Sequence, residues 1–129
     1  MKLIIAGSRT LNPGPAFICS LITHFKIPTP KEVVSGRAKG VDTAGERWAK
    51  ACQERDQDPY HYNVKEFPAN WNKYGKSAGY RRNEQMADYA DALLLIWDGE
   101  SRGSMHMKNI MSLDKKKPVY EVVLRKENV

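Results

Sequence analysis

The sequence is poor in cysteine and in long apolar segments. Its 129 residues include only two cysteines, Cys19 and Cys52, which are too few for a disulfide scaffold and do not form a Cys-x-x-Cys pair. The longest apolar run, at residues 92–97, is far shorter than the roughly 20 residues of a membrane helix. The apolar stretch after Met1 is also too short for a secretory signal. These absences predict a cytoplasmic protein with reduced thiols and no membrane partner.

The sequence also lacks the common signatures of metal and cofactor sites. The three histidines, at positions 24, 61 and 106, show no metal-ligand spacing, and no Ser-His-Asp or Cys-His order is present. There is no Gly-x-Gly-x-x-Gly fingerprint, and Gly75-Lys76-Ser77 matches only the end of a P-loop because Asn70 stands where its first glycine is required. We therefore expect no metal, no resident cofactor and no ATP hydrolysis by a P-loop mechanism.

Positive charge is in excess. Lys and Arg together number 21 against 15 Asp and Glu, which gives a net charge of +6 and favours an anionic partner such as phosphate or nucleic acid. With 41% hydrophobic residues the chain can bury a core of its own. We expect one domain over residues 1–129.

Hydrophobic periodicity predicts five strands that alternate with four helices. The strands are expected at residues 2–6, 32–35, 62–67, 92–97 and 118–124, and the helices at residues 13–26, 42–55, 80–91 and 103–115. Asn12 before Pro13 is interpreted as the N-cap of the first helix, and residues 68–79 as irregular. This alternation predicts an α/β, three-layer Rossmann-like fold of mainly parallel strands with helices on both faces.

The segment after the first predicted strand is a candidate ligand site, because parallel sheets bind ligands beyond the carboxyl ends of their strands. It reads Gly7-Ser8-Arg9-Thr10. The glycine allows close approach of a ligand, the hydroxyl groups can bond to a phosphate, and Arg9 can clamp it. An ordinary strand-to-helix turn is an equally good interpretation of these four residues alone.

The segment after the second predicted strand carries two glycines and basic residues directly before a helix. Its candidate ligand-binding residues are Ser35, Gly36, Arg37, Gly40 and Asp42. Backbone N–H groups at a helix N-terminus attract anions, and glycines leave them accessible. In the alternative interpretation Asp42 is simply the helix N-cap and Gly36 a turn residue, and both interpretations can hold at once.

A third glycine-bearing loop follows the fourth predicted strand. Gly103 and Ser104 can present N–H groups and a hydroxyl to phosphate, while Asp98, followed by Gly99, can accept hydrogen bonds from ribose hydroxyls. Arg82 and Asn83 are also predicted to bind the ligand. Two adjacent arginines at the start of a helix oppose the helix dipole unless an anion lies nearby.

Half of the twelve aromatic residues lie between positions 60 and 80, interleaved with lysines. Such mixing suits the stacking of bases beside phosphate contacts, so single-stranded nucleic acid is a possible partner. The alternative is that these rings fill the core. For Phe67 we favour the core, and for Trp71, Tyr74 and Tyr80 both interpretations stay open.

These motifs together resemble one known group of proteins. They are Gly7-Ser8-Arg9, Ser35-Gly36-x-Ala38-x-Gly40-x-Asp42, Phe67-Pro68-Ala69-x-Trp71, Gly79-x-x-Arg82-Asn83-x-x-Met86-Ala87, Ala90-Asp91-Ala92 and Trp97-Asp98-Gly99-x-Ser101-x-Gly103-Ser104. From Met1 to about Val123 the chain resembles the YspA-like, YpsA-related branch of the SLOG superfamily. The resemblance implies a Rossmann-like domain, often a homodimer, that binds a nucleotide or nucleotide-derived ligand at the carboxyl edge of its sheet, as a sensor or binding domain.

The resemblance does not by itself imply a reaction. In the phosphoribohydrolases of this superfamily an arginine and a glutamate cleave an N-glycosidic bond, and the arginine falls on Arg82. The positions that match the glutamate hold His106 and Met107, so Asp98 or Glu100 would have to replace it. Arg37 stands where the family usually has the second glycine of a pair. Hydrolysis of nucleoside monophosphates and single-strand binding are therefore kept as alternatives to ligand binding.

Overall fold

The computed structural model describes residues 1–125, and residues 126–129 of the predicted domain lie outside the described residues. Five parallel strands form one sheet in the order β3-β2-β1-β4-β5. They are β1 (Lys2–Gly7), β2 (Glu32–Ser35), β3 (Asn63–Glu66), β4 (Ala92–Trp97) and β5 (Val119–Val123). The helices are α1 (Pro15–His24), α2 (Val41–Asp56), α3 (Trp71–Tyr74), α4 (Ala78–Tyr89) and α5 (Arg102–Asn109). A 3₁₀ turn, η1 (Gly75–Ser77), joins α3 to α4, and a π-helical turn, η2 (Ile110–Asp114), continues α5.

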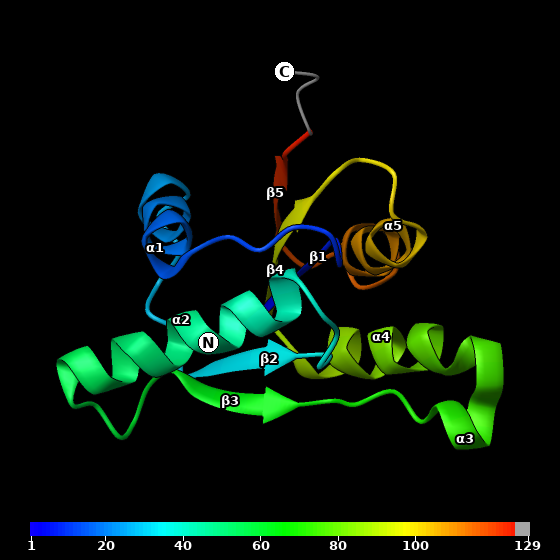
Figure 1. Cartoon of the computed structure of the whole chain (residues 1–129), viewed down its shortest axis with the longest axis horizontal. Coiled ribbons are helices and arrows are strands. Elements are labelled where there is room, and N and C mark those ends of the chain that lie inside the picture. Colours follow the sequence, from blue (N-terminus) through cyan, green and yellow to red (C-terminus); the bar gives the residue numbers. More distant parts are fainter. Residues whose placement is uncertain (126–129) are drawn as a thin grey trace.

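The helices cover both faces of the sheet, which confirms the predicted three-layer Rossmann-like fold. Successive side chains of a strand point to opposite faces. Leu3 and Ile5 accordingly pack in one buried cluster with side chains of α1 and α2, whereas Ile4 packs in a second cluster with side chains of α4 and α5. Figure 1 shows α1 and α2 on one side of the strands and α4 and α5 on the other.

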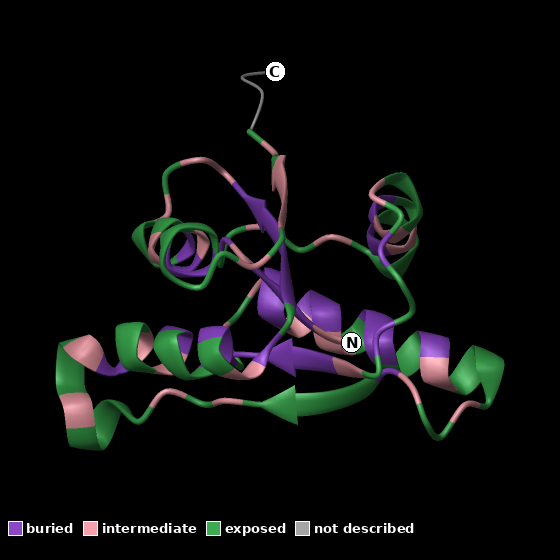
Figure 2. Ribbon diagram, turned by 180° about the vertical axis from the view of Figure 1, so that it is seen from behind, coloured by how far each residue is buried: buried purple, intermediate pink, exposed green. Residues whose placement is uncertain are grey.

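The centre of the sheet is buried and one of its edges is not. Every residue of β4 is buried, as expected for a parallel strand covered on both faces, whereas every residue of the edge strand β3 is exposed (Figure 2). Phe67, which follows β3, packs against the cluster on the α4 side and its ring lies 5.4 Å from that of Tyr89. Phe67 is therefore half-buried at the border of the core and does not fill its centre.

Two local predictions were wrong. The first helix begins at Pro15 with Gly14 as its N-cap, and the side chain of Asn12 accepts a hydrogen bond from Arg47 of α2 at 3.3 Å instead of capping the helix. Residues 68–79 are not irregular throughout. The Asn70 side chain accepts a hydrogen bond from the N–H of Lys73 at 3.1 Å and so starts α3, while Gly75, at φ 56°, ends it.

Within residues 1–125, no helix has both the length and the apolarity that crossing a membrane requires.

Candidate functional site

A cavity opens at the carboxyl ends of β1 and β4. Its volume is about 320 Å³. From β1 the chain runs outward to β2 and β3, and then returns to the other side of β1 to form β4 and β5. The strand order therefore reverses between β1 and β4, and open α/β sheets bind their ligands at this switch point.

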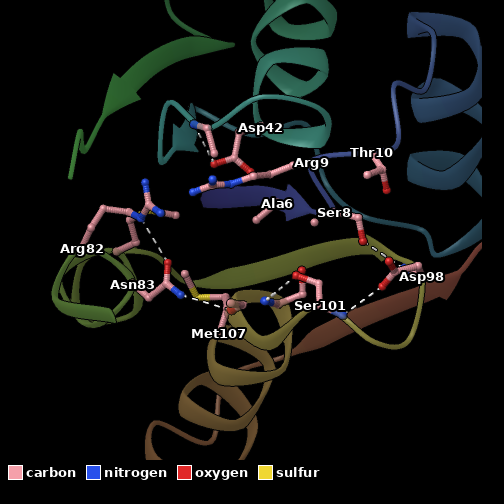
Figure 3. Close-up of a pocket in the computed structure, with 15 residues that line it drawn as sticks. Ala6, Ser8, Arg9, Thr10, Asp42, Arg82, Asn83, Asp98, Ser101 and Met107 are labelled. Atoms are coloured by element: carbon pink, nitrogen blue, oxygen red, sulfur yellow. Dashed lines mark hydrogen bonds between the residues drawn. The ribbon is translucent and has the colours of Figure 1, made fainter. Parts of the chain in front are cut away.

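Nine of the fourteen predicted site residues line this cavity (Figure 3). They are Gly7, Ser8, Arg9, Asp42, Arg82, Asn83, Asp98, Gly103 and Ser104. They come from the end of β1 and the loop after it, the first turn of α2, the second turn of α4, the loop after β4, and the first turn of α5. Segments far apart in the sequence thus meet at one place because parallel strands end at the same edge.

The loop after β1 is tied to β4. Ser8 is buried, its N–H donates to the carbonyl of Ile96 at 3.2 Å, and its hydroxyl oxygen accepts from the N–H of Asp98 at 3.0 Å. A Cβ on Gly7 would overlap the carbonyl of Ile96, so the close approach of the two strands requires glycine there. Arg9 and Thr10 are exposed and line the cavity from this loop.

Asp42 places a buried carboxylate in the cavity wall. Its side chain is only 5% exposed and its Oδ2 accepts from the N–H of Ala38 at 3.3 Å. Burial raises the pKa of Asp42 to about 6, although the positive charge of Arg82 acts in the opposite direction. The N-cap of α2 is Gly40, so the interpretation of Asp42 as the N-cap was wrong, and its carboxylate faces the cavity.

Arg82 and Asn83 connect three of the segments around the cavity. The Arg82 Nη1 donates to the carbonyl of Gly36 and its Nε donates to the Asn83 Oδ1 at 3.2 Å. The Asn83 Nδ2 in turn donates to the carbonyl of Gly103 at 3.2 Å. Burial lowers the pKa of Arg82, and the charges of Asp42 and Arg9 act on it in opposite directions, but a guanidinium stays charged at neutral pH.

The prediction that Arg82 stands at the start of a helix was wrong. α4 begins at Ala78, so Arg82 lies in the second turn, where the helix dipole is weaker than at the first. Its side chain nevertheless reaches the cavity because this side of α4 faces the carboxyl edge of the sheet.

The loop before α5 presents a carboxylate and a helix N-terminus. The Asp98 Oδ1 accepts from the N–H groups of Glu100 at 2.8 Å and Ser101 at 3.0 Å, and these bonds lower the pKa of Asp98. Asp98 is therefore ionised at neutral pH. The hydroxyl oxygen of Ser101 caps α5 by accepting from the N–H of Ser104 at 3.4 Å.

Five predicted site residues do not line the cavity: Ser35, Gly36, Arg37, Gly40 and Gly99. Arg37 forms an ion pair with Glu46 of α2, and the hydroxyl of Ser35 donates to the same carboxylate at 2.6 Å. A Cβ on Gly36 would lie 2.8 Å from the Asp42 Oδ2 and 2.9 Å from the Arg82 Nη1, so glycine there makes room for both side chains. Gly40 and Gly99, at φ 79° and 85°, shape the adjoining turns.

Sequence reasoning missed the apolar side of the cavity. Met86 and Met107 are buried and form this side together with Ala6 and Ala38, and the polar Ser101 lines the cavity as well. Met86 lies four residues after Arg82, and Met107 three residues after Ser104. Each spacing places the two residues of a pair on one face of their own helix, and this pattern in the sequence could have identified both methionines.

Of the positions considered for the missing catalytic glutamate, only some line the cavity. Asp98 and Met107 line it, whereas Glu100 is exposed and does not. The Nδ1 of His106 lies 3.3 Å from the Asn83 Nδ2, and burial lowers the pKa of this histidine. Among the described residues, no group of three or more His, Cys, Asp or Glu side chains is placed to hold a metal ion.

The aromatic side chains of Trp71, Tyr74 and Tyr80 belong to α3 and to the start of α4. Trp71 and Tyr80 are 50% and 42% exposed, and the guanidinium of Arg81 lies 4.4 Å from the ring centre of Tyr74. None of these three rings lines the cavity. Figure 1 shows α3 at the far end of α4 from the body of the molecule.

The fold and this cavity define a Rossmann-like α/β protein with a pocket of charged and apolar side chains at the switch point of its sheet. No family model matches the chain, and no solved structure matches it. Over 107 residues, which cover 81% of this chain and 83% of its relative, the chain is 30% identical to the "Gene 61 protein" of Mycobacterium phage D29. It belongs to the same family as that phage protein.

Proposed function

We propose that this protein binds a nucleotide or a nucleotide-derived ligand, as a sensor or binding domain of the SLOG type. The observation that carries the proposal is the presence of two guanidinium groups, Arg9 and Arg82, in one cavity at the switch point of the sheet. Arginine binds phosphate through two parallel hydrogen bonds, and this makes phosphate the group to expect there.

The two arginines form no ion pair within the described residues. Arg82 bonds only to the neutral oxygens of Gly36 and Asn83, and among residues 1–125 neither Arg9 nor Arg82 lies within 4.0 Å of a carboxylate oxygen. Arg82 is half-buried and feels the carboxylate of Asp42 only at a distance beyond an ion pair, so a bound phosphate would supply a direct counter-charge. The N-terminus of α5, with Gly103 and Ser104 on the cavity wall, adds the positive end of a helix dipole, although the N–H of Ser104 itself is bonded to the Ser101 hydroxyl.

The opposite end of the cavity suits the sugar of a nucleotide. An ionised carboxylate has about four acceptor positions, and the Asp98 Oδ1 uses only two of them for the N–H groups of Glu100 and Ser101. The remaining positions can accept the hydroxyl groups of ribose. Met86 and Met107 supply an apolar part of the cavity wall.

A thermal-shift panel at constant salt tests the proposal. It contains nucleoside mono-, di- and triphosphates, ADP-ribose, NAD and a short single-stranded oligonucleotide. A ligand at about 100 times its dissociation constant stabilises the fold by roughly 2.7 kcal/mol. We expect a large shift with one small nucleotide, and its incubation with the protein then shows whether free base is released, as the hydrolase alternative requires.

Two neighbouring arginines provide a matched pair of variants. Arg82→Gln should weaken the bound nucleotide at least about tenfold, because one charge-assisted bidentate contact is lost. Arg81→Gln should leave its affinity unchanged, since Arg81 is exposed and its Nε donates to the hydroxyl of Ser77 at 3.2 Å. Equal affinity of the wild type and Arg82→Gln would remove this site assignment. If instead only the oligonucleotide binds, with steep salt dependence and a loss in Arg81→Gln, the exposed aromatic and basic surface is the binding site.

A further inference from the structure

We propose that a phosphate monoester enters this cavity together with a proton, which Asp42 takes up. The inference rests on the proposed function and adds the charge state of the ligand and the pH dependence of its binding. Asp42 plays no part in the contacts with phosphate described above, and nothing in the ribose contacts needs it.

The position of Asp42 makes it a neighbour of any bound phosphate. Its carboxylate is on the cavity wall, and both its Oδ2 and the Arg82 Nη1 lie next to Gly36, within 3 Å of where a Cβ on that glycine would be. The two side chains nevertheless form no ion pair within 4.0 Å in the described structure. A phosphate bonded to Arg82 therefore comes close to a buried carboxylate.

Charged and titratable groups surround Asp42 on several elements. α4 supplies Arg82, the loop after β1 supplies Arg9, and α2 itself supplies Glu46, whose carboxylate is already engaged by Arg37 and Ser35. Lys39, on the loop before α2, is exposed. On the α5 side, His106 contacts Asn83, and burial keeps its pKa below the usual range, so it is neutral above pH 7. At the far end, Asp98 stays ionised.

The cavity around the phosphate then has two charge states. With Asp42 ionised, Arg9, Arg82 and Asp42 carry a net charge of +1, and with Asp42 protonated they carry +2. A phosphate monoester is a dianion above about pH 7, since its second pKa is about 6. Only the protonated cavity matches both of its charges.

Proton uptake follows from the change in the surroundings of Asp42. Its pKa is about 6 in the free protein, so the group is ionised at pH 7.5. A dianion beside it raises this pKa further, because two like charges in a low-dielectric site cannot both be kept. The proton comes from solvent and binds a carboxylate oxygen of Asp42, so that protein, proton and dianion combine without any other change.

Calorimetric titration of the whole protein with AMP tests the inference. Titrations at about pH 7.5 in two buffers of different ionisation enthalpy measure the number of protons taken up. We expect most of one proton for the wild type and almost none for Asp42→Asn. Asp56→Asn, the same change at the exposed C-terminal end of α2, should behave as the wild type does.

The pH dependence of affinity provides a second measurement that needs no variant. The association constant of the wild type for AMP should fall about fivefold to tenfold per pH unit between about pH 7 and 8.5, where AMP itself no longer titrates. Binding with a flat pH profile, or with equal proton uptake in the wild type and Asp42→Asn, would overturn the inference and leave the proposed function intact. If neither AMP nor any other ligand of the panel binds, the proposed function fails.

Discussion

Replacing Asp42 by asparagine should stabilise the folded, ligand-free protein at neutral and alkaline pH. The carboxylate of Asp42 is buried, and its pKa in the folded protein is about 6 instead of 3.8. Burial therefore disfavours the ionised form more than the neighbouring arginine and the backbone N–H groups favour it. Asparagine has nearly the same shape and carries no charge.

The sign and size of the effect follow from proton linkage. Between pH 3.8 and about 6 the folded protein keeps the proton of Asp42 while the unfolded chain has lost it, so stability falls as pH rises through this interval. The shift is about 2 pKa units, each equivalent to 1.36 kcal/mol, so the ionised group costs roughly 3 kcal/mol above pH 6. Below pH 3.8 this cost is absent.

Urea unfolding between about pH 4 and pH 8 measures this difference. Relative to the wild type, Asp42→Asn should gain roughly 3 kcal/mol of unfolding free energy on going from pH 4 to pH 8. Asp56→Asn is the control, because the pKa of Asp56 is lowered by its hydrogen bonds with Arg55, and its dependence on pH has the opposite direction. A constant difference between wild type and Asp42→Asn over the whole range would refute the reasoning.

Two further predictions concern stability. Lys117→Met should lose about 1.5–3 kcal/mol of unfolding free energy in urea, because the Lys117 Nζ donates at 2.7 Å to the carbonyls of Ala87 and Ala90 at the C-terminal end of α4. The control, Lys116→Met, should change little because Lys116 is exposed. Equal losses in the two variants would contradict the assigned role of Lys117. Gly40→Ala should lose at least about 1 kcal/mol, because Gly40 has φ 79° and a Cβ there would lie 2.6 Å from the carbonyl oxygen of Arg9. Gly14→Ala, where a Cβ meets nothing within 4 Å, is its control, and similar midpoints for the two variants would show that the turn tolerates a side chain.

Much of the fold could be predicted from the sequence because buried parallel strands appear in it as short apolar runs. β2 and β4 have the predicted bounds, and α2 extends the predicted helix by one residue at each end. The prediction failed at two places where individual hydrogen bonds determine the local structure. Asn12 bonds to Arg47 of another helix instead of capping its own, and Asn70 starts a helix within a segment that lacks apolar periodicity.

The place of the cavity could also be predicted, since the loops after parallel strands must meet at one edge of the sheet. Which side chains enter the cavity could not. Arg37 follows Gly36 directly, yet its side chain pairs with Glu46, whereas Arg82, from a distant helix, bonds to the carbonyl of Gly36.

The sequence by itself determined the order of strands and helices, the glycines at the strand ends and the excess of positive charge, because these depend on local residue pattern and composition. Only the tertiary structure decided that two arginines and a buried carboxylate, Asp42, share one cavity with an apolar wall of Met86 and Met107. Burial, and with it the pKa of Asp42, depends on what distant segments place around a side chain, and hydrophobic periodicity carries no information about that.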